Sequence, residues 1–138
     1  MSLVLALAKG GRSLARILIV DDNQAMVEAL SMVVSSRGHI PLTASSGKEA
    51  LEVAKSEMPD IVLLDLKMPP GIDGLETLGL LRKLPNAEGL TVLIITAADE
   101  DDLESRVTEA GGNGLLKKPV DVNLLAAQIA LHTAEAAA

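Results

Sequence analysis

The sequence contains no cysteine, phenylalanine, tryptophan or tyrosine among its 138 residues. Without cysteine the chain forms neither disulfides nor thiolate metal sites, which fits a reducing cytoplasm. Without aromatic rings it has no flat side chains on which bases or sugars could stack. Apolar residues still make up 49% of the chain, so a core must be packed from Leu, Ile, Val, Ala and Met.

Positive charge is also scarce, and long apolar runs are absent. The chain has 12 Lys and Arg residues against 19 Asp and Glu residues, which gives a formal net charge of −7. This balance argues against direct binding of nucleic acid. The longest apolar stretches are far shorter than a membrane span, so no membrane insertion is expected. The length suits one domain with a core of its own.

Four short apolar runs are each followed by residues suited to phosphate chemistry. Continuous apolar runs of this length are typical of strands in a parallel sheet that is buried on both faces. The carboxyl ends of the strands line the binding crevice of an open α/β sheet, so we expect three acids, a hydroxyl and a lysine to meet there. These are residues 17–20 before Asp21 and Asp22, 61–64 before Asp65, 92–95 before Thr96, and 115–117 before Lys118 and Pro119.

Helical patterns lie between these runs and complete an alternating order. Residues 40–44 predict a further short strand, and Pro41 places it at an edge because proline cannot donate to a sheet ladder. The five strands and five helices predict an α/β fold with a doubly wound, five-stranded parallel sheet. With Pro41 on an edge strand we expect the order 2-1-3-4-5, an expectation that rests partly on resemblance to known sheets of that order. The predicted helices begin after Asp22, at the capping-box sequence Ser46 to Glu49, at Gly74 (running to Leu84), before Leu103 and after Asp121.

The doubly wound domain is expected over residues 16–133. Residues 1–15 are interpreted as an N-terminal extension or linker: a short extra helix, a piece of linker from a larger protein, or partly a cloning remnant. Apolar residues 3–8 are followed, not preceded, by Lys9 and Arg12, which is the reverse of a signal peptide. Residues 134–138 are interpreted as a C-terminal tail.

Each candidate site residue has an ordinary structural interpretation as well. Asp21 and Asp22 can hold a hard cation such as Mg²⁺, one directly and one through water. They also suit a turn before a helix, and the metal interpretation gains weight only because Asp65 ends another buried strand. Asp65 can attack phosphorus or simply begin a loop. Thr96 also suits a strand, and a lysine at a strand end is usually solvated.

The order and spacing of these residues resemble the receiver domain of two-component response regulators, the CheY-like family. The resemblance covers about residues 16–132. It rests on the pair Asp21 and Asp22, on Asp65 with Met68-Pro69 after it, on Thr96 followed by Ala97, and on Lys118 directly before Pro119. Lys117 is the competing lysine, and the family motif favours Lys118.

The resemblance implies a phosphorylation-dependent switch rather than a turnover enzyme. Asp65 would accept a phosphoryl group from a sensor histidine kinase or a histidine phosphotransfer protein, and the domain would assist its own phosphorylation and dephosphorylation. The phosphorylated form would change its binding to an effector domain or a downstream protein in the cytoplasm. Mg²⁺ would be held by Asp21, Asp22, Asp65 and the main-chain carbonyl of Lys67. Thr96 and Lys118 would contact the phosphoryl group, and the bond before Pro119 would be cis.

Two positions depart from the family pattern. The loop over residues 68–74 is one residue longer than the usual Met-Pro-Gly-x-Asp-Gly. Leu115 stands where the family usually has Tyr or Phe, at a position that acts with Thr96 in the switch. Neither His39 nor His132 is expected near a partner, so we assign them surface or structural roles.

Three rival functions remain open at this point. A haloacid-dehalogenase-type phosphatase also uses a strand-end Asp and Mg²⁺, but it needs a second Asp where this chain has Lys67. A nucleotide-binding domain needs a glycine-rich loop after the first strand, and this chain has Asp-Asp-Asn. A degenerate receiver that binds partners without phosphate is compatible with Leu115.

Overall fold

The computed structural model describes residues 14–67, 73–85, 87–99 and 101–137. Residues 1–13 of the expected extension and residues 68–72 of the lengthened loop lie outside the described residues. Along the chain the elements are β1 (Arg16–Val20), α2 (Gln24–Ser36), β2 (Ile40–Ala44), α3 (Gly47–Glu57), β3 (Ile61–Asp65), α4 (Gly74–Arg82), the 3₁₀ helix η1 (Ala87–Gly89), β4 (Thr91–Thr96), α5 (Leu103–Glu109), β5 (Gly114–Lys117) and α6 (Val122–Ala137).

The five strands form one parallel sheet in the order β2-β1-β3-β4-β5. The predicted fold class and strand order are therefore confirmed. β2 lies at an edge, as Pro41 requires, and pairs with β1 through the register Ile17 with Pro41. All described helices are too short or too polar to cross a membrane.

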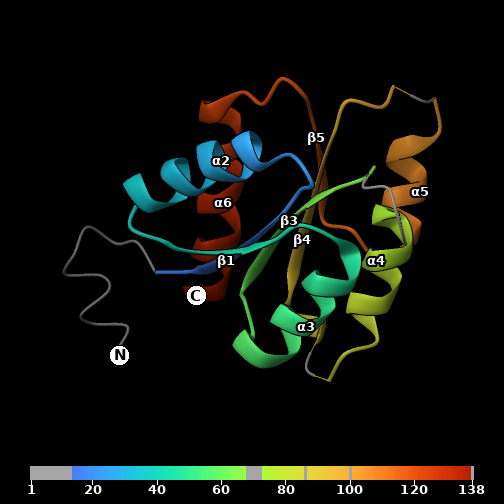
Figure 1. Ribbon diagram of the computed structural model, residues 1–138, viewed down its shortest axis with the longest axis horizontal. Helices are drawn as coiled ribbons and strands as arrows, with labels where there is room; N and C mark the ends of the chain where they lie inside the picture. Colours follow the sequence, from blue (N-terminus) through green and yellow to red (C-terminus); the bar gives the residue numbers. More distant parts are fainter. Residues whose placement is uncertain (1–13, 68–72, 86, 100, 138) are drawn as a thin grey trace.

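Helices cover both faces of the sheet, with α2 and α6 on one face and α3, α4 and α5 on the other (Figure 1). Successive residues of a strand point to opposite faces of the sheet, so each buried strand contributes side chains to the hydrophobic core on either face. The core under α2 and α6 contains Ile17, Ile19, Ile61, Leu63, Leu93, Ile95 and Leu116 from the sheet, with Val27, Leu30, Val34, Leu125 and Ile129 from the helices. The core under α3, α4 and α5 contains Leu18, Val20, Val62, Leu64, Val92 and Ile94, with Ala50, Ala54, Leu78, Leu81, Leu103 and Val107.

Side-chain caps begin four of the described helices, and in α6 Asp121 accepts from the N–H of Leu124 at 3.1 Å, as predicted. Asn23, Ser46 and Asp73 each accept a hydrogen bond from the N–H three residues on, at 3.2, 3.1 and 2.8 Å. The capping box predicted for α3 is shifted by one residue, because Glu49 accepts from the N–H of Ser45 at 3.2 Å instead of that of Ser46. The caps orient the first turns of α2 and α4 next to the carboxyl ends of β1 and β3.

The helix α4 ends earlier than its apolar pattern predicts. α4 stops at Arg82 instead of Leu84 because the N–H groups of Lys83 and Leu84 bond to carbonyls three residues back, which tightens the last turn. The Arg82 guanidinium then donates to the carbonyls of Ala87, Leu90 and Gly111. These bonds tie the end of α4 to η1 and to the turn before β5.

The expectation that the histidines have no partner nearby was wrong. Nδ1 of the buried His39 accepts a hydrogen bond from the N–H of Ala15 at 3.1 Å. Nδ1 of His132 lies 2.8 Å from the carbonyl oxygen of Gln128. Both partners are main-chain groups, which a search for partner side chains in the sequence does not reveal. The roles themselves are structural.

Candidate functional site

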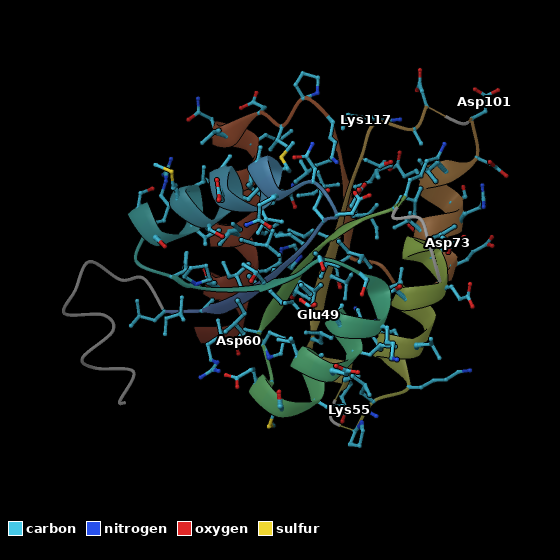
Figure 2. The ribbon with its side chains drawn as sticks, viewed as in Figure 1. Glu49, Lys55, Asp60, Asp73, Asp101 and Lys117 are labelled. Atoms are coloured by element: carbon cyan, nitrogen blue, oxygen red, sulfur yellow. The ribbon has the colours of Figure 1, made fainter. Side chains whose placement is uncertain are left out.

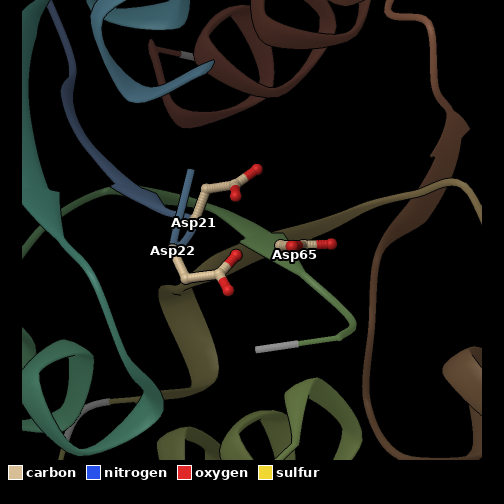
Figure 3. A group of neighbouring side chains, drawn as sticks. All are labelled: Asp21, Asp22 and Asp65. Carbon is tan, nitrogen blue, oxygen red and sulfur yellow. The ribbon is translucent and has the colours of Figure 1, made fainter. Parts of the chain in front are cut away.

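Three carboxylates meet where β1 and β3 end (Figure 3). One oxygen from each of Asp21, Asp22 and Asp65 lies within 4.8 Å of the others. Asp21 and Asp65 are buried, while Asp22 is exposed to solvent. The parallel sheet brings these residues together because the carboxyl ends of neighbouring strands share one edge.

Local contacts fix the Asp21 carboxylate and the backbone around Asp65. Asp21 Oδ1 accepts from the N–H of Asn23 at 2.9 Å, an Asx turn that leads into α2. The backbone beyond Asp65 is held by Gly74, whose N–H donates to the carbonyl of Leu66 at 2.7 Å. A Cβ at Gly74 would come within 2.5 Å of the Asp65 carbonyl oxygen, so the first turn of α4 packs on β3 only with glycine there.

Lys118 is the lysine that reaches the carboxylates. Its Nζ lies 2.9 Å from Asp21 Oδ2 and 3.5 Å from Asp65 Oδ1. Lys117 points elsewhere, toward the carbonyl of Ala98 and the carboxylate of Asp99. The geometry therefore selects Lys118 over Lys117. The Lys118–Pro119 peptide bond is cis, as the resemblance implies.

Thr96 ends β4 and is almost completely buried. Its Oγ1 accepts a hydrogen bond from the N–H of Ala98 at 3.0 Å, and its carbonyl accepts one from the N–H of Lys118 at 2.8 Å. A cavity of about 290 Å³ opens between these groups. Its lining residues are Asp65, Lys67, Thr96, Ala97, Ala98 and Lys118.

Burial and charge both perturb the site's ionisable groups. Loss of hydration raises the pKa of Asp65, and the nearby charge of Asp21 raises it further, against the opposing effects of Lys118 and of a hydrogen bond from the Lys67 backbone. Burial alone would lower the pKa of Lys118. Its hydrogen bond to Asp21 and the charges of Asp65 and Asp21 outweigh burial and raise that pKa. Three carboxylates and one ammonium leave a net negative site.

The carboxylate cluster fits a small divalent cation. Octahedral Mg²⁺ binds oxygens at 2.0–2.1 Å, which places neighbouring ligands about 2.9 Å apart and opposite ligands about 4.1 Å apart. The three carboxylate oxygens lie within 4.8 Å of one another, near these separations. Burial and the charge of Asp21 keep the pKa of Asp65 raised despite the opposing effect of Lys118. The described residues contain no other cluster of this kind.

Two larger hollows lie at the opposite end of the sheet, near the start of β3 and β4. They measure about 530 and 510 Å³ and share Asp60, Gly89 and Leu90. Neither contains any of the predicted site residues. The size of a cavity therefore does not locate the site in this protein. The convergence of charged side chains locates it.

Leu115 lies on β5, which β4 separates from the strand that carries Asp65. It pairs in register with Ile94 and is partly buried against the core under α3, α4 and α5. It therefore occupies the face of the sheet that carries Thr96, as the pattern of alternating strand residues requires.

The structure places six of the predicted site residues at this edge of the sheet and Leu115 apart from them on β5; the six are Asp21, Asp22, Asp65, Lys67, Thr96 and Lys118. Sequence reasoning missed two features beside them. One is the close approach of Gly74, signalled in the sequence only by a glycine directly after the cap Asp73. The other is the contact from Lys117 to Ala98, for which the sequence carries no signal.

Residues 17–130 match the family described as the response regulator receiver domain, and the chain belongs to this family. It is 36% identical to sporulation initiation phosphotransferase F of Bacillus subtilis over 108 residues, 78% of this chain and 85% of that protein. It is 36% identical to response regulator PleD of Caulobacter vibrioides over 115 residues, 83% of this chain but 25% of PleD.

A solved structure shows the same fold. The CheY-like receiver domain protein from Methanospirillum hungatei aligns with a TM-score of 0.82 and 28% sequence identity. The alignment covers 89% of this chain and 96% of that one. The architecture and the family assignment from sequence agree.

Proposed function

We propose that this receiver domain accepts a phosphoryl group on Asp65 and that the phosphorylated form binds its partners differently. The donor is a phosphohistidine on a sensor histidine kinase or a histidine phosphotransfer protein. One observation carries the proposal: Asp65 ends β3 at a cavity that Thr96 also lines, with the ammonium nitrogen of Lys118 3.5 Å from its Oδ1.

The chemistry that this arrangement supports is a direct transfer. A carboxylate oxygen of Asp65 attacks phosphorus, a new O–P bond forms, and the N–P bond to the histidine breaks. The imidazole leaves with the electron pair of that bond and takes up a proton. Lys118 then exchanges its contact with Asp65 for a contact with a phosphoryl oxygen, where its positive charge balances the charge of the transferred group.

Thr96 is suited to donate a hydrogen bond to the same group. Because its Oγ1 accepts from the Ala98 N–H, its own hydrogen is available to a phosphoryl oxygen in the cavity. The small side chain of Ala97 leaves the backbone there accessible from the cavity.

The residues that would hold Mg²⁺ are Asp21, Asp22, Asp65 and the main-chain carbonyl of Lys67. When bound, Mg²⁺ supplies positive charge that screens the carboxylates from the incoming phosphoryl oxygens. Asp21 and Asp65 are positioned for this by the Asx turn and by the approach of Gly74.

The site favours a switch over the rival phosphatase. Residue 67, two positions after the nucleophile, is an exposed lysine, which cannot serve as the carboxylic general acid that the rival requires. The output is proposed to lie in a downstream protein or an effector domain. The name of phosphotransferase F, which the chain resembles over most of its length, is consistent with phosphoryl transfer.

The proposal is tested by intact-mass spectrometry after incubation with acetyl phosphate and Mg²⁺. The wild type should gain the mass of one phosphoryl group, and Asp65→Asn should gain none. Asp60→Asn is the matched control because Asp60 lies at the other end of the sheet, where its carboxylate accepts from the Arg16 N–H at 2.9 Å (Figure 2). This control should be phosphorylated like the wild type.

Two results would contradict the proposal. An adduct that persists in Asp65→Asn would place the acceptor elsewhere. A wild type that gains no phosphoryl group from acetyl phosphate or from a phosphorylated histidine phosphotransfer protein would identify a degenerate receiver.

A further inference from the structure

Lys117 bridges β5 and the segment that follows β4. It pairs in register with Thr96, so both side chains lie on the same face of the sheet. Its Nζ donates to the carbonyl oxygen of Ala98 and lies 3.2 Å from Asp99 Oδ1. Figure 2 shows Lys117 at the end of the sheet opposite Asp60, which is the end that carries the site.

Ala98, which accepts a hydrogen bond from Lys117, also contacts the Thr96 hydroxyl. Ala98 accepts from Lys117 through its carbonyl and donates through its N–H to Thr96 Oγ1 at 3.0 Å. The Thr96 hydroxyl oxygen thus accepts a hydrogen bond from the Ala98 N–H, so the hydroxyl hydrogen points away from Ala98. Thr96 and Ala98 both line the cavity beside Asp65.

We propose that Lys117 is a positioning residue for phosphoryl binding, acting through Ala98 on Thr96. The proposal rests on the proposed function, because it concerns how the same cavity binds a phosphoryl group. By fixing the Ala98 carbonyl, Lys117 fixes the peptide segment whose N–H orients the Thr96 hydroxyl. Lys118, one residue on, contacts the carboxylates directly, so the two adjacent lysines hold different parts of one site.

The bond to Ala98 matters more than the ion pair with Asp99. The Asp99 side chain is 97% exposed, and ion pairs at such positions contribute little. Asp99→Asn is therefore the matched control, because it removes the charge and keeps an oxygen that can accept from Lys117. Lys117→Met removes the donor, and Lys117→Arg keeps a long cationic donor.

The first measurement uses the metal-free protein and does not depend on phosphoryl chemistry. Amide hydrogen exchange followed by NMR should show the Ala98 N–H exchanging roughly threefold to tenfold faster in Lys117→Met than in the wild type. Lys117→Arg should restore most of the protection, and Asp99→Asn should match the wild type. Unchanged exchange at Ala98 in Lys117→Met would overturn the proposal.

The second measurement titrates beryllofluoride, a mimic of the aspartyl phosphate, in the presence of Mg²⁺ and reads binding by ¹⁹F NMR. Lys117→Met should bind beryllofluoride roughly threefold to tenfold more weakly, and Lys117→Arg should recover. The affinity for Mg²⁺ alone should be unchanged in all variants, because none of them alters a carboxylate of the cluster. A general loss of structure would weaken Mg²⁺ binding as well, so the two affinities separate positioning from folding.

The outcomes separate this proposal from the proposed function. Equal beryllofluoride affinities in wild type and Lys117→Met overturn the role of Lys117 and leave phosphorylation of Asp65 intact. A fall in Mg²⁺ affinity equal to the fall in beryllofluoride affinity also overturns it. A wild type that binds Mg²⁺ but no beryllofluoride overturns the proposed function, and the role of Lys117 with it.

Discussion

The ammonium nitrogen of Lys118 lies 2.9 Å from Oδ2 of Asp21, although 97 residues separate the two in the sequence. The contact joins the end of β1 to the residue after β5, across the carboxyl ends of β3 and β4. In the metal-free protein this lysine balances part of the charge that a cation would otherwise balance. Lys118 and Mg²⁺ are therefore expected to compete for the carboxylates.

Replacing Lys118 should strengthen Mg²⁺ binding and weaken phosphoryl binding. Lys118→Met removes a positive charge next to Asp21 and Asp65, and Coulomb interactions over such distances predict roughly threefold to tenfold tighter Mg²⁺ binding. The same variant lacks the charge that would contact a phosphoryl oxygen, so it should bind beryllofluoride more weakly. Isothermal titration calorimetry with each ligand measures both effects.

Lys117→Met is the matched control for the Mg²⁺ measurement. It removes the neighbouring lysine, which contacts Ala98 and Asp99 instead of the carboxylate cluster, and should leave Mg²⁺ affinity unchanged. Weaker Mg²⁺ binding by Lys118→Met would mean that the lysine organises the carboxylates instead of competing for them.

Asp65→Asn should stabilise the metal-free protein at neutral pH. Burial and the charge of Asp21 raise the pKa of Asp65, so its ionised form destabilises the fold. The variant removes that charge, and a gain on the order of 1 kcal/mol would raise Tm by roughly 3 °C for a domain of this length. Circular dichroism melts in EDTA provide the measurement, since the chain has no Trp or Tyr.

The pH dependence of this gain has a defined sign. Because the folded-state pKa of Asp65 lies above its ordinary value of 3.8, the ionised carboxylate destabilises the fold fully only above the raised pKa. The difference between Asp65→Asn and wild type should therefore shrink as pH falls through the raised pKa and vanish below 3.8. Asp60→Asn is the control, and an equal gain in Asp60→Asn would remove the electrostatic explanation.

Mg²⁺ should stabilise the wild type by binding only the folded cluster. At about ten times its dissociation constant the linkage gain is roughly 1.4 kcal/mol, or roughly 4 °C in Tm. Asp21→Asn removes one ligand and should lose most of this shift. A wild-type Tm that does not move with saturating Mg²⁺ would contradict a cation site formed by Asp21, Asp22 and Asp65.

Leu115 should couple Asp65 weakly to the face formed by α5, β5 and α6. It packs against the core that includes Leu103 and Val107 of α5, but it has less surface than the ring usual in the family. A ligand shifts a conformational equilibrium only by its differential affinity for the two states, and a smaller side chain distinguishes those states less. Amide shift changes on adding beryllofluoride should stay close to Asp22, Asp65, Thr96 and Lys118.

Leu115→Tyr tests whether the side chain limits this coupling. The variant should extend the beryllofluoride-induced shifts to residues 103–110 and 124–129. Large shifts at those residues in the wild type would show instead that backbone motion carries the signal without a ring.

The fold could be predicted from sequence because its strands carry unambiguous signals. Apolar runs ending in Asp65 and Thr96 define buried parallel strands, and Pro41 defines an edge, so the carboxyl edge follows from topology. Contacts between side chains and main chain could not be predicted. The contact of Glu49 with Ser45 depends on the local backbone geometry at the start of α3, and the bond between His39 and Ala15 joins residues that only the fold brings together.

The measurement that tests the central claim most directly traps the phosphorylated residue chemically. Borohydride reduces an aspartyl phosphate to homoserine, and peptide mapping by tandem mass spectrometry then locates it. After incubation with acetyl phosphate and Mg²⁺, we predict homoserine at position 65 and at no other aspartate. Homoserine at Asp21 or Asp22, or none in a protein that has gained a phosphoryl group, would contradict the account.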